Sequence, residues 1–181
     1  MEQKTPIFKL NKSVFFVGFM GAGKTTLARR LARNLGLSTV DADTYFERRI
    51  GMTAGDYLRA HGEPAFRAKE TEVLKELMAW EPSLISCGGG VVVTPENREL
   101  LKQQCVVYLQ TTADQSKARI SNLASRPLFS SLEKARALAE ERAPLYEEVA
   151  TVTVSVIGRP VVSLATEVQQ ALEAEGVLCR Q

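Results

Sequence analysis

The stretch GFMGAGKT, residues 18–25, decides the fold of this chain. It matches the pattern G-x-x-x-x-G-K-[ST], whose glycines let the backbone turn sharply and present successive N–H groups to a phosphate. A short apolar run at 13–17 precedes it and favours a buried strand, and leucines recur at helical spacing after it until Gly36. This strand–loop–helix context predicts a nucleotide-binding loop; the alternative is a glycine-rich turn that binds nothing.

Two side chains at the end of this loop carry phosphate chemistry. Lys24 would place a positive charge beside the β- and γ-phosphates of a nucleotide, and the hydroxyl of Thr25 would ligate Mg²⁺. The start of the following helix adds the positive end of its dipole. A loop of this type does not fix the reaction, because GTPases, ATPases and small-molecule kinases share it.

The remaining pattern predicts an α/β protein with one parallel sheet covered by helices on both faces. Further short apolar runs predict strands at 37–40, 83–87, 105–109 and 151–156. Capping boxes at Thr112–Gln115 and Ser130–Glu133 predict two helix starts, the second helix ending near Pro144. A last helix is expected at about 160–175, and the breaker-rich segment at about 121–130 is expected to form a lid. We expect a single domain over residues 1–181.

Composition excludes several classes of partner. The chain has 23 basic and 21 acidic residues, and a net charge of +2 is too small to indicate a nucleic acid or a membrane surface. No apolar run approaches the roughly 18 residues of a membrane span, so we expect a cytoplasmic protein. The spacing of Cys87, Cys105 and Cys179 fits no metal site and predicts reduced thiols, with a redox role for Cys87 as the alternative. His61 is expected at the surface, in a polar turn.

Two polar segments follow predicted strands at the sheet edge where ligands gather. Asp41 and Asp43 come after the strand at 37–40 and could serve a metal and a proton acceptor, or could cap a helix. Gly88, Gly89 and Gly90 come after the strand at 83–87 and could present backbone N–H groups to a ligand, or could form a flexible turn.

Three arginines stand in motif-like surroundings: Arg67 in GEPAFR, Arg126 before a proline, and Arg142 in ERAPLY. A single arginine is more often a solvated surface residue. Arginine also makes the bidentate contacts that a carboxylate or a phosphate requires.

Together these segments resemble the shikimate kinase family. The shared motifs, from about residue 13 to about residue 157, occur in family order: GFMGAGKTT, DAD at 41–43, GEPAFR ending at Arg67, GGG at 88–90, SRPL at Arg126 and RAPLY at Arg142. One motif such as RPL is weak, but the ordered set is highly specific. This chain has Thr25 where the family usually has serine, and Leu58 where an aromatic residue often lines the acceptor pocket.

The resemblance implies a role for each matching position. Asp43, Lys24 and Arg126 would be catalytic, with Asp43 as the proton acceptor. Thr25 would bind Mg²⁺ directly and Asp41 through water. ATP would be held by Gly21, Ala22, Gly23, Lys24, Thr25, Thr26, Arg119, Arg126 and Arg159. Shikimate would be held by Asp43, Arg67, Gly88, Gly89, Gly90 and Arg142.

The resemblance also implies a fold and an activity. The expected fold is a three-layer sandwich of the P-loop nucleoside-monophosphate-kinase type, with five parallel strands in the order 2-3-1-4-5. The expected activity is phosphorylation of the 3-hydroxyl of shikimate by ATP with Mg²⁺, in aromatic amino acid biosynthesis through chorismate. The acceptor-binding region would span about 41–70, and we expect a monomer.

Two other functions remain to be weighed. Another small-molecule kinase, such as a gluconate kinase, would share the loop but not the paired Arg67 and Arg142 with the triple glycine. A nucleotide-binding switch of the GTPase type would need a DxxG and an NKxD-like motif, and the sequence has neither.

Overall fold

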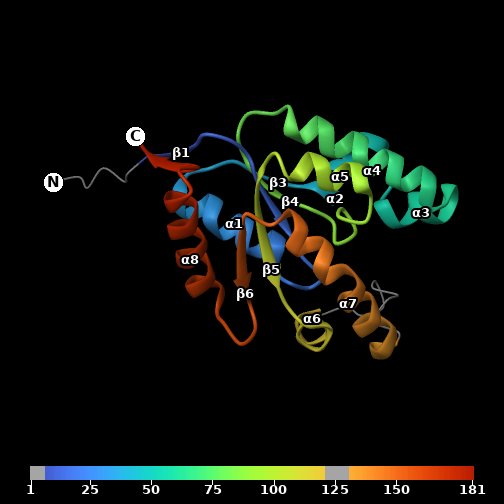
Figure 1. Ribbon diagram of the computed structural model, residues 1–181. Helices are drawn as coiled ribbons and strands as arrows, with labels where there is room; N and C mark the ends of the chain where they lie inside the picture. The colour runs from blue at the N-terminus through green and yellow to red at the C-terminus, as the bar shows by residue number, and fades with distance from the viewer. Residues whose placement is uncertain (1–6, 121–130) are drawn as a thin grey trace.

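The protein, in a computed structural model, is described at residues 7–120 and 131–181. A central parallel sheet is covered by helices on both faces (Figure 1). The segment predicted as a lid and its Arg126 lie outside the described residues.

The sheet has the predicted strand order. Its strands run β3-β4-β2-β5-β6, which is 2-3-1-4-5 when the sheet strands are counted along the chain, and every neighbouring pair is parallel. Their bounds are β2 (Val14–Val17), β3 (Thr39–Asp41), β4 (Leu84–Ser86), β5 (Cys105–Gln110) and β6 (Val152–Ser155).

The central strand β2 is apolar throughout because both of its faces are buried. Val14 and Phe16 pack on the side of α1 (Lys24–Leu35) and α8 (Val161–Ala174). Phe15 and Val17 pack on the other side, with α4 (Glu63–Met78), α5 (Pro95–Leu101) and α7 (Leu132–Val149). A strand buried on both faces shows a continuous apolar run and no alternation.

Several elements were not predicted. Two short helices, α2 (Ala42–Ile50) and α3 (Ala54–His61), fill the region after β3, and β1 (Phe8–Leu10) pairs antiparallel with β7 (Leu178–Arg180). α3 buries no residue, so it has no strong apolar stripe to reveal it. His61 is exposed as predicted, although it ends α3 and does not lie in a turn.

Of the two predicted capping boxes one is confirmed, whereas the second box and the helix end near Pro144 are wrong. Thr112 caps α6 (Ala113–Arg119), accepting a hydrogen bond from the Gln115 amide at 3.2 Å. α7 is capped by Ser131, which accepts from the Lys134 amide, and not by Ser130. α7 also continues through Pro144 to Val149. Proline removes one helical hydrogen bond, but Tyr146 and Val149 are buried in the core beyond it and hold the last turns in place.

The cysteines in the described ranges are free thiols. Burial raises the pKa of Cys87 far above its ordinary value, which argues against a reactive thiolate. Within residues 7–120 and 131–181, no helix is long and apolar enough to cross a membrane.

Asn97 ties α5 to the chain that leaves the triple glycine. It is fully buried; its amide donates to the Val91 carbonyl at 3.0 Å, and its carbonyl oxygen lies 2.7 Å from the Thr71 hydroxyl.

We expect Asn97→Ala to lower the free energy of unfolding by about 1–3 kcal/mol, because it leaves buried polar groups unpaired. Urea unfolding measures this, and Asn34→Ala on the exposed face of α1 is the control. Equal stability of the two variants would contradict the structural role.

Candidate active site

The loop between β2 and α1 needs its glycines for conformational reasons. Gly18, Gly21 and Gly23 have φ values of 149°, 76° and 92°. A side chain at Gly18 would also meet the Leu109 carbonyl, at 2.6 Å from its Cβ. Lys24 is buried at the start of α1, and its Nζ donates to the Gly18 and Phe19 carbonyls at 2.8 and 3.0 Å. The ammonium group is therefore held within the loop that the sequence assigns to phosphate.

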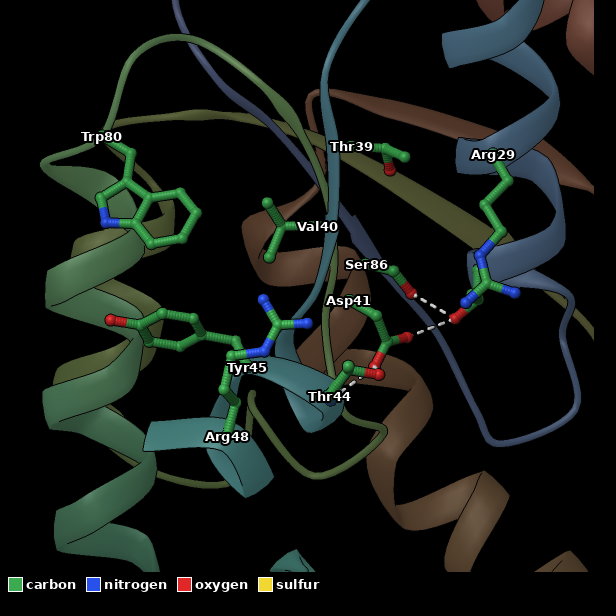
Figure 2. A pocket seen from close by; sticks show the side chains of 10 residues that line it. Arg29, Thr39, Val40, Asp41, Thr44, Tyr45, Arg48, Trp80 and Ser86 are labelled. Atoms are coloured by element: carbon green, nitrogen blue, oxygen red, sulfur yellow. Dashed lines mark hydrogen bonds between the residues drawn. The ribbon is translucent and has the colours of Figure 1, made fainter. Parts of the chain in front are cut away.

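Thr25 joins the phosphate loop to the ends of two neighbouring strands. Its hydroxyl donates to Asp41 Oδ2 at 2.6 Å and lies 2.9 Å from the Ser86 hydroxyl (dashed lines at Asp41 and Ser86 in Figure 2). The other oxygen of Asp41, Oδ1, accepts from the Thr44 amide at 2.9 Å and so caps α2. Asp41 thus caps a helix and also faces the loop, so the two alternatives for this residue are not exclusive.

Ser86 is a polar residue of the site that the sequence did not reveal. It is the last residue of the buried strand β4, where it looks like one small residue in an apolar run. Its position just before Cys87 and the triple glycine is the only available signal.

A cavity of about 190 Å³ brings the two predicted halves of the site together. One wall is the phosphate loop from Met20 to Thr26; the other contains Asp41, Asp43, Gly88 and Gly89. Groups expected to bind a nucleotide and groups expected to bind an acceptor therefore line one space.

Each glycine of the triple lies against a different part of the site. A Cβ on Gly88 would lie 3.2 Å from Asp43 Oδ1, and one on Gly89 would lie 3.4 Å from the Met20 amide. A Cβ on Gly90 would lie 2.6 Å from Arg67 Nη1. None of the three has a positive φ, so the space around them and not a left-handed backbone distinguishes them: a Cβ would press on Asp43 at Gly88 and displace the Arg67 guanidinium at Gly90, and would make an ordinary contact at Gly89.

Hydrogen bonds hold this glycine loop through its carbonyl groups. Tyr146 donates its hydroxyl to the Gly89 carbonyl at 2.5 Å, and Arg67 Nη1 donates to the Gly90 carbonyl at 3.2 Å. Burial raises the pKa of Tyr146 to about 12, so the phenol keeps its proton as a donor. The amides of Gly88, Gly89 and Gly90 donate to no acceptor within the described residues.

Arg67 and Arg142 both lie beside the glycine loop. Arg67, near the start of α4, pairs with Glu70 at 3.0 Å. Arg142 Nη1 would lie 3.9 Å from a Cβ on Gly89, and its buried Nε has no hydrogen-bond partner among the described residues. A buried guanidinium nitrogen without a partner is costly, and an anion bound there would satisfy it.

Glu70 is a second residue that sequence reasoning missed. Its side chain is only 14% exposed, between Arg67 and the Asp43–Gly88 contact. Burial raises its pKa, and the Arg67 guanidinium opposes that shift. Its spacing of three residues from Arg67 on a helix was the available signal, but Glu63 has a similar spacing and is exposed.

The two arginines expected at adenine differ in their surroundings. Arg119 reaches the phosphate loop, donating from Nη1 to the Ala22 carbonyl at 3.1 Å and from Nη2 to the Val156 carbonyl at 2.7 Å. Arg159 instead contacts α8, where it donates to the Ser163 hydroxyl and pairs with Glu167.

Comparisons with known proteins agree with this geometry. A family model described as shikimate kinase matches residues 20–173. Shikimate kinase of Enterococcus faecalis is 40% identical over 167 residues, covering 90% of this chain and 99% of the relative. Shikimate kinase of Halorhodospira halophila is 39% identical, covering 90% and 94%.

Solved structures give the same result. Shikimate kinase from Acinetobacter baumannii in complex with shikimate superposes with a TM-score of 0.84 at 37% identity, covering 91% of this chain and 94% of that one. A gluconokinase from Sinorhizobium meliloti, at 18% identity and a TM-score of 0.59, shares the fold alone. With its phosphate loop, its paired arginines and its triple glycine in the matched region, the chain belongs to the shikimate kinase family.

Proposed function

We propose that this protein transfers the γ-phosphoryl group of ATP to the 3-hydroxyl of shikimate, giving 3-phosphoshikimate and ADP in the biosynthesis of aromatic amino acids. One observation carries the proposal: the phosphate loop and the Asp43–Gly88 contact line the same cavity. Phosphoryl transfer depends mainly on positioning and charge stabilisation, so donor and acceptor groups must share one space.

On the nucleotide side, the loop from Gly21 to Thr26 would hold the phosphates, with Lys24 neutralising their charge. Arg119, which already lies over the loop, would contact the adenine end. Arg126 would approach the transferring phosphoryl group, and Arg159 would contact adenine after leaving its partners on α8. An arginine that moves to the phosphates stabilises charge only when the substrates are in place.

Thr25 and Asp41 fit Mg²⁺ by their chemistry. A hydroxyl and a carboxylate are hard oxygen donors, and they already meet at 2.6 Å. In the described part of the chain no cluster of three or more His, Cys, Asp or Glu side chains could hold a metal ion. Thr25, directly, and Asp41, through water, would therefore share the ion with the nucleotide phosphates. When bound, Mg²⁺ neutralises charge on the β- and γ-oxygens.

On the acceptor side, Arg67 and Arg142 would clamp the carboxylate of shikimate, and the amides of Gly88, Gly89 and Gly90 would face its ring. Glu70 would keep the Arg67 fork oriented before the substrate arrives. Asp43 would accept the proton of the 3-hydroxyl. At the same time the hydroxyl oxygen would form its bond to the γ-phosphorus and the bond between that phosphorus and ADP would break. Lys24 and Arg126 would stabilise the charge on the transferring group.

The surroundings of the reaction are also proposed. We expect a monomer in the cytoplasm that acts on free shikimate and ATP and contacts neither nucleic acid nor membrane. The small net charge of +2 supports this expectation.

The direct test is a coupled ADP-release assay with shikimate and gluconate as alternative acceptors. We expect turnover with shikimate to exceed that with gluconate by a factor on the order of 10² or more, because a rigid ring loses less entropy in a fixed clamp. Lys24→Met should abolish turnover with a normal circular-dichroism spectrum. Equal use of gluconate would remove the assignment of the acceptor, and an active Lys24→Met enzyme would remove that of the phosphate loop.

Asp43→Asn separates catalysis from structure. Asn keeps the shape and loses the charge, so we expect kcat to fall by a factor on the order of 10² or more with little change in stability. The α2 cap belongs to Asp41, which stays intact in this variant. An unchanged kcat would show that Asp43 accepts no proton.

Arg67→Lys tests the clamp. Lysine keeps the charge but lacks the planar fork, so it cannot pair with Glu70 and a substrate carboxylate together. We expect the KM for shikimate to rise about tenfold or more, because roughly one charge-assisted hydrogen bond to the substrate is lost. The KM for ATP should change little. Lys69→Arg, two positions further along α4, is the matched control. If KM for both substrates rose together, Arg67 would serve the fold and not the clamp.

A further inference from the structure

A second cavity lies at the outer edge of the sheet, beside the edge strand β3. It has a volume of about 230 Å³, larger than the cavity of the proposed active site. Figure 2 shows it between α1, β3 and α2, with Trp80 at one side. The side chains that carry the argument are Arg29, Asp41, Tyr45, Arg48 and Trp80.

Two guanidinium groups face this cavity. Arg29 lies one helical turn after Thr25 on α1, and Arg48 lies one turn after Thr44 on α2. Figure 2 shows them on opposite sides of Asp41. In the described ranges neither side chain makes a hydrogen bond or an ion pair, whereas the adjacent Arg49 pairs with Glu76. Both side chains are exposed, and what distinguishes them from other surface arginines is that they line one cavity from two different helices.

The charge in the cavity is complementary to an anion. Asp41 is its one acidic lining residue, and both oxygens of that carboxylate already accept hydrogen bonds, from Thr25 and Thr44. With two arginines against one carboxylate, the walls carry a net positive charge. Guanidinium groups bind carboxylates and phosphates through paired planar hydrogen bonds.

An aromatic wall completes the cavity. Tyr45 and Trp80 pack edge to face, with their centroids 5.0 Å apart. The Tyr45 hydroxyl donates to Glu76 at 2.7 Å, which fixes that ring, and Trp80 is 44% exposed. A planar apolar group could cover the exposed indole, as stacked aromatic contacts do elsewhere.

We propose that this cavity is a second ligand site, which binds a small planar ring compound bearing a carboxylate or a phosphate. The anionic group lies between Arg29 and Arg48, and the ring lies against Trp80. The site is separate from the one between the phosphate loop and the triple glycine, but the two cavities share Thr25 and Asp41 as a common wall. The proposal does not depend on which acceptor the enzyme phosphorylates.

Trp80 is the only tryptophan of the chain, so its fluorescence reports on this cavity directly. The probes are phenyl phosphate and benzoate, which separate a phosphate from a carboxylate, with benzyl alcohol as the uncharged control. Each is titrated into the free protein and into protein saturated with MgADP and shikimate. We expect a saturable change with at least one of the two anions and none with the alcohol. The fluorescence change should persist in the saturated protein. The midpoint of the titration should shift, because Thr25 and Asp41 line both cavities.

Variants assign the signal to the arginines. Arg29→Ala and Arg48→Ala should each weaken probe binding about tenfold or more while kinase activity is kept, because each removes one charge-assisted contact. Arg33→Ala, one turn further along α1 and exposed, should bind as the parent does. Calorimetry on the saturated protein gives the same affinities independently of fluorescence. The proposal fails if calorimetry finds no binding, if MgADP and shikimate abolish binding, or if the three variants bind equally.

Discussion

The hydrogen bond from Thr25 to Asp41 connects the parts of this molecule that must act together. Thr25 belongs to the first turn of α1, Asp41 ends β3 and begins α2, and Ser86, the other neighbour of the Thr25 hydroxyl, ends β4. These segments are far apart in the sequence and meet because parallel strands place their carboxyl ends at one edge of the sheet. If Asp41 were displaced, the cap of α2 and the position of Asp43, two residues later, would change with it.

The same geometry explains why the site is built from glycines and charged side chains. β2 lies at the middle of the sheet, so the loop that leaves it is flanked by the ends of β4 and β5. Gly18 passes under the Leu109 carbonyl of β5, and Gly89 approaches the loop amide of Met20. A Cβ at Gly18 would overlap that carbonyl, and a Cβ at Gly89 would already be in van der Waals contact with the loop. Close backbone approach is therefore a condition for placing a nucleotide and an acceptor in one cavity.

Local signals explain which features the sequence could predict. The phosphate loop is a continuous motif, and the fully buried strands are apolar runs, so both are readable without knowledge of the fold. Strand order could be reached only through resemblance to a family, because no local pattern states which strands are neighbours. Ser86 and Glu70 could not be predicted: their roles depend on contacts with Thr25 and Arg67 across the folded chain, and many other residues have the same type and spacing. The extension of α7 beyond Pro144 was missed for a related reason, since the burial of Tyr146 and Val149 outweighs the local cost of proline.

Arg67 and Arg142, the two arginines beside the glycine loop, differ in the charges and hydrogen-bond partners around them. Glu70 is buried enough for its pKa to be raised, so its ionised form depends on Arg67. Arg67 is thereby held in place by Glu70 and by the Gly90 carbonyl before any ligand is present. Arg142 has a buried Nε with no partner in the described residues, and it lies against Gly89. A ligand carboxylate between the two arginines would give Arg142 an acceptor. Its other contact would be to Arg67, which is already oriented. Under the proposed function, selectivity for the substrate carboxylate would arise from Arg67, which Glu70 orients in advance, and from the buried Arg142 Nε, to which the carboxylate would supply an acceptor.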